Sequence, residues 1–401
     1  MIRKIIAISI SIAIAGTIAS NLAVAAPSFK SARLNDTGLS YTYSGQGLIP
    51  IALLDDGQVI FTGPVSYGPD NCPVATSPDQ TMCTPLVNKE TLALVSPTQP
   101  AMVLPLNVLN KEYRINHLGQ MALWDYTTPQ TMTLVDLHTS TPTPFSPNSL
   151  IPPACLDNNI NAGLNLPMLS DANQLLWVPS SNCSSASGVY LWSTNAQSHV
   201  SNPTGYTLIT VASTNTSGQF AVTASLKTTV SPASTRAFIW NGTKYKVLSP
   251  PFLSLISGYS SSEAVAMNDA GTVAGNLVKR DGSRHAGIWH GTKSTNIGTL
   301  ANYTSSVAMA IGPNGVVLAC AYSDPSALYS GGDTTMFLWN NGVKQAWTDA
   351  VSSADGVTPS ASCSGMYGQY EPHALRLISN RVGQWVLRDP YGVNFLISPI
   401  Q

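Results

Sequence analysis

Three glutamates stand at equivalent places in a chain that is poor in acidic side chains. Glu112, Glu263 and Glu371 each lie shortly before an apolar run and a turn, and only 10% of the residues are charged. Carboxyl groups that converge near a cation can bind a polar ligand, or act as general acid and base. Arg114 and His373 are close to two of the glutamates in the sequence and could complete such a site.

Aromatic residues accompany these charged groups. The candidate ligand-binding residues are Glu112, Tyr113, Arg114, Glu263, Tyr303, Tyr370, Glu371 and His373. If the chain is an enzyme, Glu263, Glu371 and His373 are the expected catalytic groups. Alternatively, all of these residues are solvated loop positions without a common role.

Sequence motifs for catalysis are absent. The chain has no G-x-S-x-G elbow, H-E-x-x-H, phosphate-binding loop, S-x-x-K or EF-hand loop. His117, His285 and His290 lie in or beside repeated turns and strands, and we interpret them as structural. The sequence therefore predicts no metal and no cofactor, and it leaves catalysis undecided.

The candidate residues are positioned by a repeated unit, a tight turn followed by an apolar strand. Its clearest copy is N-D-A-G-T-V-A-G at 268–275. Seven turns share a residue suited to positive φ, namely Gly57, Gly119, Asn173, Gly218, Gly271, Gly315 and Gly383. They recur every 44 to 68 residues. We interpret the Asn and Asp residues of these turns as scaffold.

A second signature, an alternating strand that ends in Trp, follows several turns, as in R-A-F-I-W at 236–240. Each unit then supplies four strands, A to D, and repeats of this length with four strands are typical of β-propellers. We predict an all-β fold, one seven-bladed propeller of four-stranded antiparallel blades over residues 26–401, with blade 5 at about 262–300. An N-terminal strand at 38–45 is expected to join the last blade and close the ring.

One stretch also resembles a known family. H-A-G-I-W, N-I-G-T-L and S-S-V-A-M-A-I-G-P-N-G-V-V, within residues 230–345, are similar to the HAF repeat of bacterial extracellular proteins. The chain departs from the usual pattern at Gly287, Gly312 and Cys320. The resemblance implies an exported, propeller-like repeat protein, and it transfers no catalytic residue.

Residues 1–25 have the organisation of a secretory signal peptide. Arg3 and Lys4 precede an apolar run, and Ala23-Val24-Ala25 forms a cleavage site. The apolar run is too short for a comfortable membrane span. We therefore expect a soluble protein that is secreted, periplasmic or held at the cell surface.

Six cysteines form an even set, which favours disulfide bonds in an exported chain. The predicted blades place all six on or near one face of the disc. Sequential pairing is then geometrically reasonable, and it joins Cys72 to Cys83, Cys155 to Cys183 and Cys320 to Cys363.

Composition and architecture together suggest a partner class. The chain carries 19 basic and 20 acidic residues without a polybasic cluster, so nucleic acid and anionic membrane are poor partners. We predict a monomeric, non-catalytic binding propeller that recognises an extracellular glycan or protein through its loop-rich face. The alternatives are a hydrolase or lyase acting on polysaccharide, and a structural surface protein.

Overall fold

The computed structural model describes the strands and most of the short turns of the chain. The described residues are 29–34, 49–64, 90–95, 102–108, 111–125, 132–139, 141–145, 168–179, 187–193, 196–227, 234–251, 258–330, 332–353, 356–357, 359–364, 377–388 and 393–400. All structural statements below refer to these residues.

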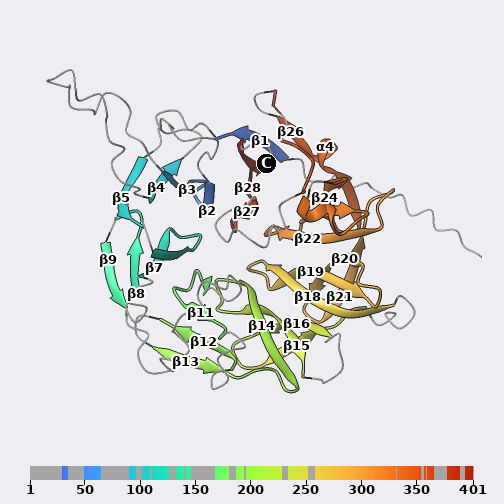
Figure 1. The fold of residues 1–401 in the computed structure, drawn as a ribbon, viewed down its shortest axis with the longest axis horizontal. Coiled ribbons are helices and arrows are strands. Elements are labelled where there is room, and N and C mark those ends of the chain that lie inside the picture. The colour runs from blue at the N-terminus through green and yellow to red at the C-terminus, as the bar shows by residue number, and fades with distance from the viewer. Residues whose placement is uncertain are drawn as a thin grey trace, which may run out of the picture.

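Seven sheets surround a central axis, with the first strand of each blade nearest the centre (Figure 1). Blade 1 has β2 (Ile49–Leu53), β3 (Val59–Pro64), β4 (Glu90–Val95) and β5 (Met102–Asn107). Blade 2 has β6 (Lys111–Ile115), β7 (Gln120–Asp125), β8 (Met132–Asp136) and β9 (Thr141–Phe145). Blade 3 has β10 (Met168–Leu169), β11 (Leu175–Trp177), β12 (Val189–Trp192) and β13 (Gln197–Val200).

The next three blades repeat this order. Blade 4 has β14 (Tyr206–Thr214), β15 (Phe220–Leu226), β16 (Thr235–Trp240) and β17 (Tyr245–Leu248). Blade 5 has β18 (Tyr259–Met267), β19 (Thr272–Lys279), β20 (Arg284–His290) and β21 (Lys293–Gly298). Blade 6 has β22 (Ser305–Ile311), β23 (Val317–Tyr322), β24 (Thr334–Asn340) and β25 (Val343–Ala346), with the short helix α3 (Ala327–Ser330) between β23 and β24.

Blade 7 differs because it collects strands from three parts of the chain. Its order is β26 (Val351–Ser353), β1 (Phe29–Arg33), β29 (Asn394–Pro399), β28 (Trp385–Arg388) and β27 (Leu377–Ser379). The helix α4 (Trp347–Ala350) leads directly into β26. The predicted seven-bladed propeller, closed by an N-terminal strand, is therefore confirmed.

The core lies between the blades rather than inside each sheet. In the described part of the chain, apolar clusters lie between blades 3 and 4, 4 and 5, 5 and 6, 6 and 7, 7 and 1, and 1 and 2. Middle strands such as β23 are buried on both sides, because each blade packs against two neighbours. Burial on both faces explains the continuous apolar runs that follow each turn.

The strand that closes the ring is not the expected one. Phe29–Arg33 pairs with β29, antiparallel, in the place of the fourth strand. The expected segment 38–45 lies outside the described residues. Segment 38–45 alternates more regularly in the sequence than 29–33, but Phe29 is 3% exposed and its ring stacks on Trp385 with 4.6 Å between centroids. The outer edge of β1 is covered in turn by β26, which runs parallel to it (Figure 1).

One of the three expected disulfides is described, and it lies beside this closure. Cys320 of β23 bonds to Cys363 in the connection that follows β26, and both residues are fully buried. The amide of Cys363 also donates to Thr334 Oγ1. The bond therefore fastens the connection after blade 6 to the sheet of blade 6. Cys72, Cys83, Cys155 and Cys183 lie outside the described residues.

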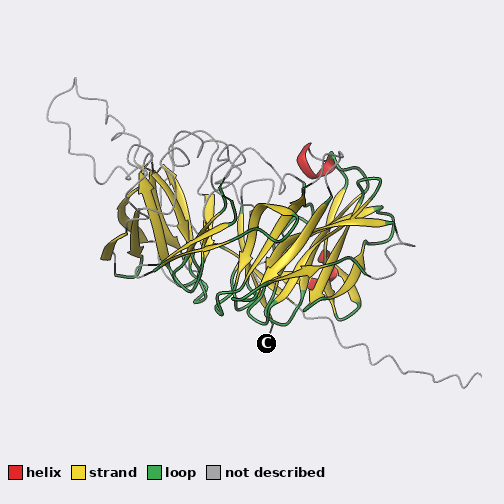
Figure 2. Cartoon of the chain, turned by 90° about the horizontal axis from the view of Figure 1, so that it is seen from below, coloured by secondary structure: helices red, strands yellow, loops and turns green. Residues whose placement is uncertain are grey.

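The two faces of the disc differ in their connections. Strand direction alternates within each blade, so the A–B and C–D turns share one face, which we call the turn face. The long connections 65–89, 146–167 and 354–376 begin and end at the opposite face, which we call the loop-rich face. Figure 2 shows the disc from its edge, with short turns along the lower rim. None of the helices described is long and apolar enough to cross a membrane.

Candidate functional site

The seven A–B turns converge at the axis on the turn face, and each has its own local reason to form. Six carry Gly and one carries Asn173 at the fourth position, all with positive φ. Asn at the first position caps the turn: in blade 5, Asn268 Oδ1 accepts the N–H of Thr272. The same side chain reaches the next blade, because its Nδ2 donates to the carbonyl oxygens of Gly312 and Pro313, 3.1 Å away in each case.

The second residues of five of the seven turns form a shared polar cluster, which we call the axial network. Its members are Asp55, His117, Asp171, Asp269 and Arg381, from blades 1, 2, 3, 5 and 7. Arg381 bonds to both oxygens of Asp55, and its Nε lies 3.6 Å from Asp171 Oδ2. Its Nη1 lies 3.9 Å from Asp269 Oδ2. Since blades 3 and 5 do not adjoin blade 7, this one guanidinium spans the axis.

His117 and Asp171 form one ion pair of the network. The Asp171 side chain is only 3% exposed, and its Oδ1 accepts the backbone N–H of His117 at 2.9 Å. His117 Nδ1 lies 3.0 Å from Asp171 Oδ2, and Nε2 lies 3.0 Å from the carbonyl oxygen of Ser379. Both ring nitrogens therefore face acceptors, an arrangement that only the doubly protonated imidazolium satisfies.

The pKa values of this pair move in opposite directions. Burial alone would lower the pKa of His117, but the hydrogen bond and charge of Asp171, with help from Asp55 and the Ser379 carbonyl, raise it above 6.5. Burial would raise the pKa of Asp171, yet its hydrogen bonds to His117 and the charges of His117 and Arg381 hold that pKa below 3.8. Both shifts favour the charged forms of the two groups.

The charged side chains of the axial network are paired with one another. Each carboxylate of Asp55 and Asp171 is bonded to Arg381 or His117, and Thr216 donates to Asp269 Oδ1 through its N–H and its hydroxyl. Among the described residues, no group of three or more His, Cys, Asp or Glu side chains is suited to hold a metal ion. The network therefore links the blades to one another through ion pairs and hydrogen bonds.

A pH dependence follows from the raised pKa of His117. A raised folded-state pKa gives stability that is complete below about 6.5 and is lost as pH rises through the folded value. We expect His117→Gln to lower the thermal midpoint most near pH 5 to 6, and progressively less toward pH 9. Asp171, whose pKa is lowered, adds stability that is lost only as pH falls below its ordinary value.

Thermal unfolding of wild type and variant from pH 5 to 9 measures this effect. His138→Gln is the matched control, since His138 is an exposed histidine on the same face and outside the network. A difference between wild type and His117→Gln that stays constant over this range would contradict the role of the imidazolium.

The residues singled out from the sequence fall in several separate places. Glu263 lies within β18, where its Oε2 accepts from Asn276 Nδ2 at 3.1 Å and from Arg284 Nε at 3.3 Å. Tyr303 donates to Asp333 Oδ1 at 2.9 Å. Glu263 is thus held inside its own blade, next to the start of β20, and Tyr303 lies at the junction with blade 6.

The other candidates divide between the core and the undescribed parts. Tyr113 is 4% exposed and belongs to the apolar cluster between blades 1 and 2, while Arg114 Nη1 donates to the Tyr113 carbonyl oxygen. Glu112 lies within β6, opposite Trp124. Tyr370, Glu371 and His373 lie outside the described residues, so their convergence with Glu112 and Glu263 stays a prediction.

His285 lies in a saturated hydrogen-bond chain on the loop-rich face, as expected for a structural residue. Its Nε2 faces the Thr304 carbonyl oxygen, and its Nδ1 faces the hydroxyl of Tyr259, which also accepts from Asn296 Nδ2. Burial, together with the charge of Lys279, lowers the pKa of His285. A neutral ring that accepts from Tyr259 and donates to Thr304 satisfies every partner.

Sequence interpretation missed the axial network because it treated the turn residues as scaffold only. The signal was present at the second turn position, which holds Asp55, His117, Asp171, Thr216, Asp269, Pro313 and Arg381. Charged residues are far more frequent in this set than the 10% of the whole chain. Tight-turn formation does not require them, so their concentration indicated a shared environment at the axis.

Comparison with solved structures finds only distant similarity. No family model and no curated protein matches the chain. Among solved structures, the β-propeller domain of the Trilobed protease from Pyrococcus furiosus is 11% identical, with 76% of this chain and 84% of that one covered and a TM-score of 0.43. A TolB-like protein from Agrobacterium tumefaciens is 11% identical, with 61% and 83% covered and a TM-score of 0.38. Porphyromonas gingivalis dipeptidyl peptidase 4 is 10% identical, with 79% and 47% covered and a TM-score of 0.40.

Proposed function

We propose that this protein is an exported, non-catalytic binding propeller that recognises an extracellular glycan or protein through its loop-rich face. The observation that carries the proposal is the contrast between the two ends of the axis. On the turn face, the axial network spans the axis and bonds its own charges. The opposite end of the axis is where the long connections meet the sheets. We place the binding surface there, because long loops on a rigid scaffold can contact an extended partner.

Composition supports a neutral partner. Only 10% of the residues are charged, and the sequence has no polybasic or polyacidic cluster that would attract an oppositely charged surface. The apparent signal peptide and the resemblance to an extracellular repeat support export. Glu112, Glu263 and Glu371, from blades 2, 5 and 7, remain the polar groups proposed for the binding face.

The test compares two variants on a glycan array and in pull-down from an extracellular protein fraction. One carries Glu112→Gln, Glu263→Gln and Glu371→Gln on the proposed face. The control carries Thr292→Ala and Lys293→Ala, exposed residues of a C–D turn on the opposite face. We expect wild type and control to retain the same ligand, and the triple variant to lose at least tenfold in affinity.

Two outcomes would contradict the proposal. Equal retention by all three proteins would remove the glutamates from the binding site. Release of new reducing ends from a bound polysaccharide, lost in the triple variant, would show a catalyst rather than a binding module.

A further inference from the structure

Blades 2 and 3 are joined near the axis by the same kinds of contact as blades 7 and 1, and a cavity lies beside these contacts. Asn116 Nδ2 of blade 2 donates to the Ser170 carbonyl oxygen of blade 3 at 3.0 Å, and the backbone N–H of His117 donates to Asp171. These contacts lie close to the axis. An open cavity of about 400 Å³ lies between the two blades, within the range of about 300–1,000 Å³ that is usual for small-molecule sites.

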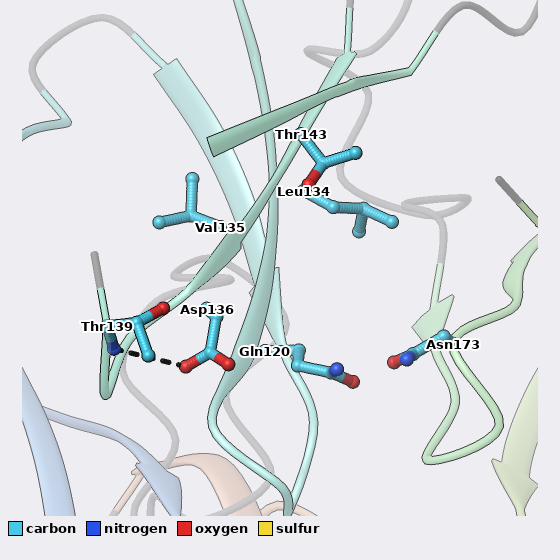
Figure 3. A pocket seen from close by; sticks show the side chains of 7 residues that line it. All are labelled: Gln120, Leu134, Val135, Asp136, Thr139, Thr143 and Asn173. Carbon is cyan, nitrogen blue, oxygen red and sulfur yellow. Dashed lines mark hydrogen bonds between the residues drawn. The ribbon is translucent and has the colours of Figure 1, made fainter. Parts of the chain in front are cut away.

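Five polar residues and two aliphatic residues, Leu134 and Val135, line this cavity in the described part of the chain. Figure 3 shows Gln120, Leu134, Asp136, Thr139 and Thr143 of blade 2 on one side and Asn173 of blade 3 on the other. The amide ends of Gln120 and Asn173 point toward each other across the gap. Asp136 is the only charged group among the lining residues.

Asn173 is an exception within the repeat. The other six turns have Gly at this position, with φ between 72° and 85°, and Asn173 has φ 56°. A side chain is disfavoured at such φ values, because Gly alone adopts them without steric cost. Blade 3 therefore carries a side chain where local turn chemistry prefers none.

The space beside this position differs between blades. A Cβ at Gly271 would lie 3.0 Å from Oε1 of Gln219, the glutamine that opens strand B of the preceding blade. A Cβ at Gly119 would lie 2.7 Å from His138 Nε2. In blade 2, Gln120 holds the position that Gln219 holds in blade 4. Beside Gln120, the cavity leaves room for the side-chain amide of Asn173. Among the described residues, a Cβ at Gly218 or Gly315 would also meet nothing nearer than 3.9 Å, so room alone does not set blade 3 apart; what sets it apart is that Asn173 places an amide in the cavity lining.

The hydrogen bonds at the cavity leave particular groups available. Asn116 Nδ2 donates to Gln120 Oε1 at 3.0 Å and to Asn173 Oδ1 at 3.3 Å, so both amide oxygens are already used. Asp136 Oδ1 accepts the N–H groups of His138 and Thr139. In the described part of the chain, Gln120 Nε2, Asn173 Nδ2 and Asp136 Oδ2 have no partner. The cavity thus offers two oriented donors opposite one strong acceptor.

We propose that the cavity between blades 2 and 3 binds a neutral pyranose, either a free monosaccharide or one sugar unit of a glycan. Sugar hydroxyls both donate and accept, so neighbouring hydroxyls can accept from the two amides and donate to Asp136. Leu134 supplies apolar surface for the C–H groups of the ring. Asp136 disfavours an anion. The site lies on the turn face, and it does not depend on the function proposed for the loop-rich face.

Saturation-transfer NMR and calorimetry with D-glucose, D-galactose, D-mannose and L-fucose, and with their oligosaccharides, test the proposal. The main variant is Asn173→Gly, which restores the residue that the other six turns carry and removes the cavity amide without strain. Asn341→Gly is the matched control, because Asn341 also has positive φ, 47°, in an exposed turn outside the cavity lining. We expect saturable binding of at least one sugar, at least a tenfold loss in Asn173→Gly, and less than a twofold change in Asn341→Gly.

A second variant checks the acceptor. Asp136→Asn keeps Oδ1 for the turn amides but replaces the free oxygen by a donor, and we expect a similar loss. Equal binding of monosaccharide and oligosaccharide would identify a free-sugar site, and preference for the oligosaccharide would identify a glycan subsite. Absence of binding to every sugar, or full binding by Asn173→Gly, would overturn the proposal. The Glu112, Glu263 and Glu371 triple variant should bind the sugar as wild type does, which separates this site from the loop-rich face.

Discussion

Replacing Cys320 and Cys363 together by alanine is expected to lower the free energy of unfolding by about 4 kcal/mol. The two residues are 43 positions apart, and cross-linking a loop of that length restricts the unfolded chain by about this amount in the chain-entropy model. Alanine is the suitable replacement because both side chains are fully buried, where a serine hydroxyl would need a partner. Urea unfolding of the two proteins measures the difference.

The location of the disulfide bond predicts which strands are destabilised first when the bond is removed. Cys363 lies in the connection that follows β26, and β26 covers the outer edge of the closing strand β1. Without the bond, hydrogen exchange should become faster in β26 and β1 before it does in blades 4 and 5. Loss of less than about 1 kcal/mol, with unchanged exchange in β1, would contradict this account.

The number and order of the blades could be predicted from the sequence because each blade is marked locally. The tight turn before Thr272 needs positive φ at Gly271, and the apolar run after it is buried on both sides. Both requirements act over a few residues, so they leave a pattern that survives irregular spacing. Even Asn173 was recognised as a turn residue, because Asn is the next residue after Gly to tolerate that conformation.

The closing strand could not be predicted in the same way. Segment 38–45 alternates between apolar and polar residues and segment 29–33 does not, so the local pattern favours 38–45. The choice depends on contacts made across the whole chain, such as the stacking of Phe29 on Trp385 and the pairing of Phe29 with Val351. Neither partner is near Phe29 in the sequence, so the choice of closing strand follows only from contacts in the folded ring.

The axial network was missed for a related reason. Asp55, Asp171 and Arg381 are far apart in the sequence, and each occupies an ordinary turn. Only the convergence of seven turns at one axis brings Arg381 within reach of carboxylates from three blades. Glu263, in contrast, drew attention because acids are rare in this chain, and in the structure it pairs with Arg284 of its own blade.

The remaining prediction concerns the closure itself. Phe29→Ala is expected to lower the free energy of unfolding by about 3–5 kcal/mol, the usual cost of removing a buried Phe side chain. Phe29 is 3% exposed, and it shares an apolar cluster with Trp347, Val351 and Trp385. Its loss opens a cavity between the first and last parts of the chain. Denaturant unfolding measures the change, and Ile400→Ala, at a residue 51% exposed, is the control and should alter stability by less than about 0.5 kcal/mol.

Hydrogen exchange decides which segment closes the ring. If β1 holds the place of the fourth strand, weakening it in Phe29→Ala exposes the backbone groups of β29 and β26 together, because β1 lies between them. Both strands should then exchange faster, and the bared edges should make the variant more prone to aggregate. If β29 stays fully protected in Phe29→Ala, another segment must pair with it, and 38–45 would be the first to examine. The exchange of β29 thus decides between the two candidate closing strands, of which the sequence pattern alone favours 38–45.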